Sequence, residues 1–255
     1  MKHGLKLAVA ALSTAGVLAA CGASNDNAGS DKESKVITVG TEATYPPFTY
    51  KEKGKLTGYD VDVMNEVAKR AGYKVDYKSM DFKGLIPALD SKRIDVIANQ
   101  MGITPERQEK YAFSDAYTVS GSTIIVNNKT NDIKTLDDLK GKTVGSTQGS
   151  LYAKTAEEAG AKVKYYKGAN QVLKDLEAGR VDAAMNDRLF VLTELKKAGY
   201  KVKAVGETFD KNESGFMMAK NSKYTEDFNK ALADMQEDGT LAEIGKKYFN
   251  EDISK

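Results

Sequence analysis

Short apolar segments alternate with amphipathic segments from Val36 onward, and this alternation limits the fold more than any other feature of the chain. The segment Val36-Ile37-Thr38-Val39 is typical of a buried strand, and Asp60 is expected to cap a helix that ends at Gly72. A predicted strand over 73–77, a helix around 85–89 and a strand over 94–98 continue the series. Such alternation predicts an α/β fold, in which helices flank mainly parallel sheets.

The alternation starts again after Ser120-Gly121-Ser122, which we interpret as a break between two series. The second series has predicted helices from Thr135, from Ser150, over 169–178 and from Arg188, and predicted strands over 143–146, 162–166, 181–185 and 201–205. Two consecutive αβ series predict two lobes, each with a central sheet flanked by helices, and a ligand-binding cleft between the lobes. The segment 216–219 and the closing helices over 225–237 and 241–249 fit either lobe.

Residues 1–20 are predicted to be a signal peptide. Lys2 and Lys6 form a basic start, and the apolar stretch over 7–20 is too short to span a bilayer as a helix. The segment Leu18-Ala19-Ala20-Cys21 resembles the lipobox of bacterial lipoproteins, which implies that Cys21 becomes a lipidated N-terminus. An ordinary signal peptide that happens to end near a cysteine is the alternative. Residues 21–35 contain no large apolar side chain, which predicts a flexible tether.

The loss of this segment restricts the chemistry that the mature domain can carry. His3 is the only histidine and is removed with the signal peptide, and lipid would occupy the sulfur of Cys21, the only cysteine. A cysteine or histidine nucleophile, a Ser-His-Asp triad, a zinc site of His and Cys ligands and a disulfide are therefore excluded. We expect no metal and no cofactor.

The charge balance bears on the partner. The chain has 38 Lys and Arg residues against 36 Asp and Glu residues, so the removal of Lys2 and Lys6 leaves 36 of each. A domain with zero formal charge and no basic block is a poor nucleic-acid binder, and a small-molecule partner is expected instead.

Three predicted helix starts carry candidate binding residues. Thr104-Pro105 predicts a helix start with Arg107 in the first turn. A cation beside the exposed backbone N–H groups of a helix start suits a carboxylate ligand. The sequence is equally consistent with an ion pair between Arg107 and an acidic side chain on the surface. Ser150 can cap a helix beginning at Leu151, whose free N–H groups could face an anion. Asp187 ends a predicted strand and could receive an ammonium group, although a plain N-cap role is as consistent.

Two aromatic residues follow predicted strands. Tyr45 precedes two prolines that make a rigid turn, and Phe82 follows the strand over 73–77. Spacing alone favours a core position for both residues.

Together these segments resemble the polar amino acid-binding family of ABC importers, which has the type II periplasmic-binding-protein fold. The resemblance runs from about Val36 to the C-terminus. It is carried by Thr41-Glu42-Ala43-Thr44-Tyr45-Pro46-Pro47-Phe48, Gly58-Tyr59-Asp60-Val61-Asp62, Leu89-Asp90-Ser91-Lys92-Arg93-Ile94-Asp95-Val96, Ile103-Thr104-Pro105-Glu106-Arg107, Phe113-Ser114-Asp115-Ala116-Tyr117 and Asp238-Gly239-Thr240-Leu241.

The resemblance implies roles for the candidate residues. Arg107 matches the arginine that clamps the ligand carboxylate, and Asp187 matches the acid that accepts the ligand ammonium group. Four further positions match backbone or hydroxyl contacts to these two groups: Gln100, Gly102, Ser150 and Leu151. Gly102 and Leu151 lack the hydroxyl or amide side chain of some relatives, which leaves only their N–H groups. The positions lining the side-chain pocket are Glu42, Tyr45 and Phe82.

The resemblance also implies a domain organisation, in which the chain returns to its first lobe at the end. We expect a first lobe over 36–123, a second lobe over 124–215 and a return segment over 216–255. The crossing strands near 120–124 and 213–216 would form the hinge.

Within this family the chain looks most like cystine-binding proteins. Asn99-Gln100, Tyr117-Thr118-Val119-Ser120-Gly121, Asp187-Arg188-Leu189 and Asn212-Glu213-Ser214-Gly215 carry this closer resemblance. It implies a lipid-anchored monomer on the extracytoplasmic face of the membrane that delivers L-cystine to the permease and ATPase subunits of an ABC transporter. A binding protein for glutamine or another polar amino acid is the first alternative.

Two other classes of function are compatible with this fold or its location. The same fold resembles cyclohexadienyl dehydratases, for which Glu42 or Asp187 would have to act as an acid with a raised pKa. An extracellular sensor of a membrane kinase is a third class, and the sequence after residue 20 has no apolar stretch of the length such a sensor needs.

Overall fold

The computed structural model describes residues 35–255, apart from the side chains of residues 196 and 198. The predicted signal peptide, the lipidation at Cys21 and nearly all of the predicted tether lie outside this range. Within the described range, no helix has the length and apolar character needed to cross a membrane.

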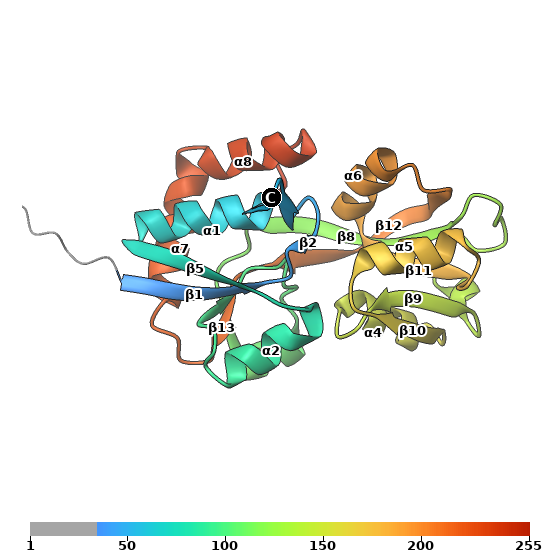
Figure 1. Cartoon of the computed structure of the whole chain (residues 1–255), viewed down its shortest axis with the longest axis horizontal. Helices are drawn as coiled ribbons and strands as arrows, with labels where there is room; N and C mark the ends of the chain where they lie inside the picture. Colours follow the sequence, from blue (N-terminus) through green and yellow to red (C-terminus); the bar gives the residue numbers. More distant parts are fainter. Residues whose placement is uncertain (1–34) are drawn as a thin grey trace, which may run out of the picture. The chain divides into compact units, whose positions relative to one another are not determined.

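The first lobe is built on a five-stranded sheet with the strand order β5-β1-β6-β13-β7 (Figure 1). Strand β1 is parallel to β5 and β6, and β13 is antiparallel to β6 and β7. Helices α1, α7 and α8 contact one another, and α2 packs against β1 and β6. The bounds are β1 Lys35–Thr41, α1 Tyr59–Arg70, β5 Tyr73–Ser79, α2 Phe82–Asp90, β6 Val96–Ile97, α3 Pro105–Lys110, β7 Tyr111–Phe113, β13 Met217–Ala219, α7 Thr225–Glu237 and α8 Thr240–Phe249.

The second lobe is built on another five-stranded sheet, with the order β10-β9-β11-β8-β12. Strand β9 is parallel to β10 and β11, whereas β8 is antiparallel to β11 and β12. Helices α4, α5 and α6 pack against this sheet. The bounds are β8 Thr118–Asn127, a 3-10 turn Asp137–Leu139, β9 Thr143–Thr147, α4 Leu151–Glu158, β10 Lys162–Tyr166, α5 Ala169–Glu177, β11 Ala183–Asp187, α6 Arg188–Ala198 and β12 Val202–Ser214.

Apolar side chains at helical spacing explain how the helices bind the sheets. In α1, Val63, Met64 and Val67 are fully buried and belong to the same core cluster as Ile37 and Val39 of β1. The two β1 residues are two positions apart and therefore point to the same face of the sheet. The period of 2 in the strand and of about 3.6 in the helix thus produce one joint apolar layer.

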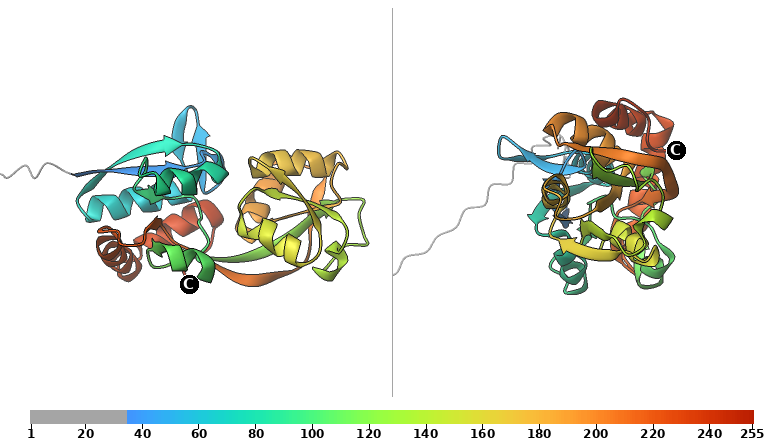
Figure 2. Two further views of the ribbon diagram at one scale, coloured as in Figure 1. Left: turned by 90° about the horizontal axis from the view of Figure 1, so that it is seen from below. Right: turned by 90° about the vertical axis from the view of Figure 1, so that its right-hand side faces the viewer.

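Strands β8 and β12 run between the two lobes, as the left view in Figure 2 shows. They pair antiparallel from Val202 opposite Asn127 to Ser214 opposite Thr118. The segment Ser120-Gly121-Ser122, interpreted from the sequence as a break between the two series, lies inside the continuous strand β8, near the place where the family resemblance implied a crossing strand. Gly121 is needed for space: a Cβ atom there would collide with the Thr208 side chain and with backbone oxygens of β12.

The structure departs locally from the prediction in three places. Helix α1 begins at Tyr59 with Gly58 as N-cap, because the Asp60 side chain instead accepts a hydrogen bond from the backbone N–H of Gln100. The helix predicted from Thr135 is only the short turn Asp137–Leu139, because the Asp138 carboxylate accepts both the Lys134 and the Thr135 N–H groups at 2.9 Å. A three-stranded sheet with no counterpart among the predicted elements consists of β2 Thr44–Tyr45, β3 Thr49–Glu52 and β4 Lys55–Thr57.

Candidate functional site

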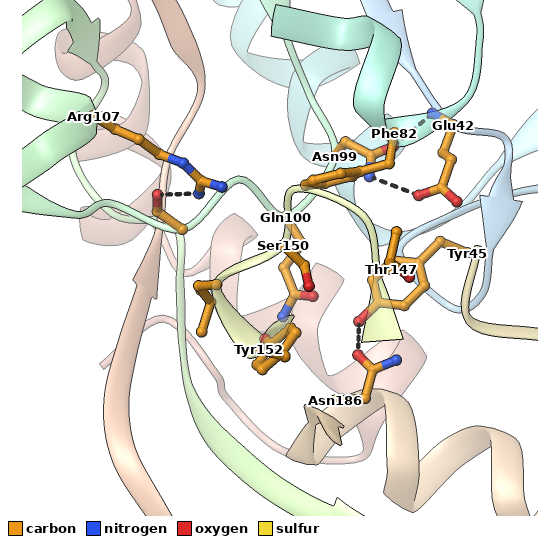
Figure 3. A pocket seen from close by; sticks show the side chains of 12 residues that line it. Glu42, Tyr45, Phe82, Asn99, Gln100, Arg107, Thr147, Ser150, Tyr152 and Asn186 are labelled. Carbon is orange, nitrogen blue, oxygen red and sulfur yellow. Dashed lines mark hydrogen bonds between the residues drawn. The ribbon is translucent and has the colours of Figure 1, made fainter. Parts of the chain in front are cut away.

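A cavity lies where side chains of the two lobes meet (Figure 3). Eight of the nine predicted binding residues line it, and Asp187 does not. The lining residues are Glu42, Tyr45, Phe82, Asn99, Gln100, Gly102, Arg107, Thr147, Ser150, Leu151, Tyr152 and Asn186.

Arg107 lies in the first turns of α3, which begins as predicted, with Pro105 as first residue and the Thr104 hydroxyl accepting the Arg107 N–H. Its guanidinium donates to the backbone oxygens of Gly102 at 2.8 Å and of Gly149, in the second lobe, at 3.1 Å. Burial lowers the pKa of the guanidinium. Among residues 35–255 no carboxylate forms an ion pair with Arg107, so the surface pair considered as an alternative is not present.

The N-terminus of α4 faces the same cavity from the second lobe. The Ser150 hydroxyl caps this helix by accepting the Ala153 N–H at 3.1 Å, as the sequence predicted. Ser150, Leu151 and Tyr152 all line the cavity, together with Thr147 at the end of β9. The partial positive charge of this helix end and the Arg107 guanidinium therefore lie on neighbouring walls, which suits a carboxylate.

Glu42 lies across the cavity from Arg107, at the carboxyl end of β1 (Figure 3). Asn99 holds it in place: the Asn99 side chain accepts the Glu42 backbone N–H at 2.6 Å and donates to the Glu42 carboxylate at 3.3 Å. Burial raises the pKa of the Glu42 carboxyl to about 7, although the hydrogen bonds from Asn99 and Thr44 act in the opposite direction. No cation pairs with Glu42 among the residues that the structure describes.

Gln100 has a backbone φ of 44°, which is uncommon for a residue other than glycine. The fully buried Asp60 carboxylate accepts the Gln100 N–H and so supports this conformation. Burial raises the pKa of Asp60 to about 7. Asp60 thus acts on the cavity through Gln100, a role that its helix-start position in the sequence did not indicate.

The two predicted aromatic residues differ in their surroundings. Tyr45 is nearly buried, stacks on Phe190 of α6 with ring centroids 4.9 Å apart, and donates its hydroxyl to Asn186 at 2.8 Å. It therefore joins the two lobes as well as lining the cavity. Phe82, the first residue of α2, is half-buried and presents its ring to the cavity (Figure 3).

Asp187 lies behind the cavity wall. Its carboxylate caps α6 by accepting the Leu189 N–H at 2.7 Å, and it also accepts the hydroxyls of Ser120 at 2.9 Å and Tyr152 at 3.0 Å. Burial raises its pKa, and these hydrogen bonds oppose the shift. The N-cap role is thus present, and Tyr152 lies between Asp187 and the cavity; a contact with a ligand ammonium group stays a prediction.

Sequence reasoning missed four lining residues, Asn99, Thr147, Tyr152 and Asn186. Asn99 directly precedes Gln100, and Asn186 directly precedes Asp187. Both asparagines lie near the carboxyl end of a strand, where ligands tend to bind, and this position was the signal that could have identified them. Tyr152 gives no such signal, because its position in the first turn of α4 is known only once the helix is placed. Within residues 35–255 no group of three His, Cys, Asp or Glu side chains could hold a metal ion.

The comparisons with known proteins agree with this architecture. The model of a family described as bacterial extracellular solute-binding proteins, family 3, matches residues 37–251. The chain is similar to the L-cystine-binding protein TcyA of Bacillus subtilis, with 47% identity over 270 residues that cover 100% of both chains. It is also similar to the L-cystine-binding protein TcyJ of Escherichia coli, with 41% identity over 88% of this chain and 86% of the relative.

A solved structure resembles the fold closely. The arginine-, lysine-, histidine-binding protein ArtJ from Geobacillus stearothermophilus superposes with a TM-score of 0.82 at 31% identity, covering 86% of this chain and 96% of that chain. Two lobes, each a sheet flanked by helices, are thus shared with proteins that bind amino acids. The chain belongs to family 3 of the bacterial extracellular solute-binding proteins.

Proposed function

We propose that the cavity binds the zwitterionic part of an amino acid, with Arg107 and the α4 N-terminus on the carboxylate and Glu42 and Asp187 on ammonium groups. One observation carries the proposal: a cation, Arg107, and an acid, Glu42, line one cavity, and a second acid, Asp187, lies behind its wall. None of the three forms an ion pair with a residue in the described part of the chain. Buried charges need compensation, and a ligand with both charges would supply it.

We propose L-cystine as the ligand. Cystine has two zwitterionic ends, which fits acidic groups at two places, Glu42 on the cavity wall and Asp187 behind it. Its disulfide would contact the rings of Tyr45 and Phe82, and sulfur–aromatic contacts contribute about 0.3–1.5 kcal/mol each. The names of the two relatives above support this choice, whereas glutamine or another polar amino acid remains the alternative.

The test is calorimetric titration of the purified mature domain with cystine, glutamine, arginine and glutamate. We expect cystine to bind at least tenfold more tightly than the others. Dominant binding of glutamine or arginine, with none of cystine, would contradict the cystine assignment and leave the amino acid-binding function intact. Binding of no amino acid would contradict both.

We further propose that the chain is a receptor and not an enzyme. The pKa of about 7 at Glu42 would suit an acid catalyst, which is the one feature in favour of a dehydratase. However, both oxygens of this carboxylate accept hydrogen bonds, from Asn99 and Thr44, as a binding group would. Cyclohexadienyl dehydratase activity of the wild-type protein that disappears in Glu42→Gln would overturn this proposal.

The remaining partners follow from the same proposal. The chain would act as a monomer, anchored through lipid on Cys21 to the extracytoplasmic face of the membrane and delivering its ligand to ABC permease and ATPase subunits. Lobe boundaries at 36–123, 124–215 and 216–255 belong to this proposal as well. The position of β13, from the last part of the chain, between β6 and β7 supports the return segment.

A further inference from the structure

Gly102 is a glycine for reasons of space. Its backbone lies outside the left-handed region, so another residue could adopt the same conformation. However, a Cβ atom at this position would lie 2.5 Å from Cδ2 of Leu151 and 3.5 Å from Nη1 of Arg107. Gly102 is buried in the segment between β6 and α3, and the Leu151 side chain lies against it.

The contact joins the two lobes, because Leu151 is the first residue of α4. The Arg107 guanidinium bridges the same place with polar contacts, to the oxygen of Gly102 in the first lobe and that of Gly149 in the second. A methyl group of Leu151 and the guanidinium of Arg107 thus both lie close to Gly102. A larger residue at 102 would displace both.

The contact between Gly102 and Leu151 lies between two cavities. Arg107, Ser150 and Leu151 line the inner cavity and also a second, outer cavity whose other walls include Glu106, Gln148 and Lys154. Between the two cavities Leu151 supplies the apolar part of the wall. The ion pair of Lys154 with Glu106 lies on the outer side, where its side chains are 53% and 61% exposed, so it contributes little to holding the lobes together.

We propose that Gly102 and Leu151 are a matched pair that seals the amino acid cavity between the lobes. Position 102 thereby determines affinity through packing, without a side chain that touches the ligand. The inference rests on the proposed function, since the sealed space is the proposed amino acid site. It also explains why these two positions have neither hydroxyl nor amide: an apolar contact between the lobes takes the place of a polar side-chain contact to the ligand.

The experiment is a double-mutant cycle with Gly102→Ala, Leu151→Ala and the double variant. Leu151 can avoid an added Cβ only by rotating its methyl group off Gly102, which breaks the contact. We expect each single variant to weaken amino acid binding about tenfold, from the loss of part of one leucine's burial. In the Leu151→Ala background, Gly102→Ala should change affinity less than about twofold, because no leucine is left to displace. Gly84→Ala is the matched control, since its Cβ would meet only the Met80 side chain, at 3.8 Å or more, and should leave affinity unchanged.

Two outcomes would contradict the proposed pairing of Gly102 with Leu151. One is an unchanged affinity in Gly102→Ala. The other is an equal loss of affinity from Gly102→Ala in the wild-type protein and in the Leu151→Ala variant. The cycle uses whichever amino acid binds the wild-type protein, so a different ligand does not affect it. If no amino acid binds, the proposed function fails, and urea unfolding of the same variants then tests the pair. If the two substitutions then changed the free energy of unfolding independently of each other, the proposed pairing of Gly102 with Leu151 would be wrong.

Discussion

At the scale of single residues, the site depends on two charged groups, the buried Glu42 and the half-buried Arg107, that have no charged partner in the described part of the chain. Arg107 is held by two backbone oxygens and Glu42 by the Asn99 amide, so each side chain is oriented but not neutralised. Hydrogen bonds of this kind fix a geometry before the ligand arrives, which reduces the ordering cost of binding.

Arg107→Ala should remove amino acid binding while the protein stays folded. Losing one partner of a buried ion pair typically costs about 3–5 kcal/mol, which is at least a hundredfold in affinity. Calorimetry measures the affinity and circular dichroism checks the fold. Arg180→Ala is the control, because its guanidinium pairs with Asp175 on the surface of the second lobe. Equal affinities of the two variants would remove Arg107 from the site.

Glu42→Gln should change the pH dependence of stability. The pKa of this carboxyl is about 7 in the folded protein against an ordinary value of 4.5, so between these pH values the folded state binds more protons than the unfolded state. The free energy of unfolding therefore falls as the pH rises through this window, by up to roughly 3 kcal/mol from this one group.

Urea unfolding at pH 4.5 to 7.5 measures the effect. The variant should lose less stability than the wild type over this range. Asp60, with a pKa also raised to about 7, contributes equally to both proteins and cancels in the comparison. Parallel stability curves would show that Glu42 titrates in the folded protein as it does in the unfolded chain.

At the scale of elements, the short helix α4 matters most in the second lobe, because its first residues line the cavity. A helix of 8 residues has little stability by itself, so its cap and its packing on β9 and β11 hold it in place. The same cap directs the free N–H groups of its first turn toward the cavity.

Ser150→Ala should lower the free energy of unfolding by about 1 kcal/mol, the usual effect of removing an N-cap side chain. It should also weaken amino acid binding, because the first turn of α4 loses its support. Ser150→Asn retains a capping oxygen and should restore most of the stability. If both variants are as stable as the wild type, the cap seen at Ala153 contributes nothing to the fold.

At the scale of the whole molecule, the N-terminal segment is predicted to determine where the protein works. The lipobox-like sequence before Cys21 predicts attachment through acyl chains rather than through a spanning helix. Cys21→Ala should move the protein from the membrane fraction to the soluble fraction outside the cytoplasm, with unchanged affinity for its ligand. Fractionation followed by immunoblotting measures the distribution. Retention of the variant in the membrane fraction would contradict the anchor.

The local sequence determined most of the elements and the positions of the charges. The capped starts at Thr104 and Ser150, the strand over 162–166 and the helix over 225–237 were predictable, because each depends on residues within a few positions of one another. The family resemblance added the roles of residues such as Arg107, which spacing alone left open.

Only the tertiary structure decided what joins the lobes. Ser120-Gly121-Ser122 looked like a break, yet strand β12, about ninety residues away, pairs with it and makes it continuous. Asp60 looked like a helix cap, yet its carboxylate holds the backbone of Gln100. In the sequence, Gly102 and Leu151 appeared only to lack side chains that could bind the ligand, yet in the structure the two residues contact each other. In each case the deciding partner lies far along the chain, so its effect is absent from the local pattern and arises only when the chain has folded.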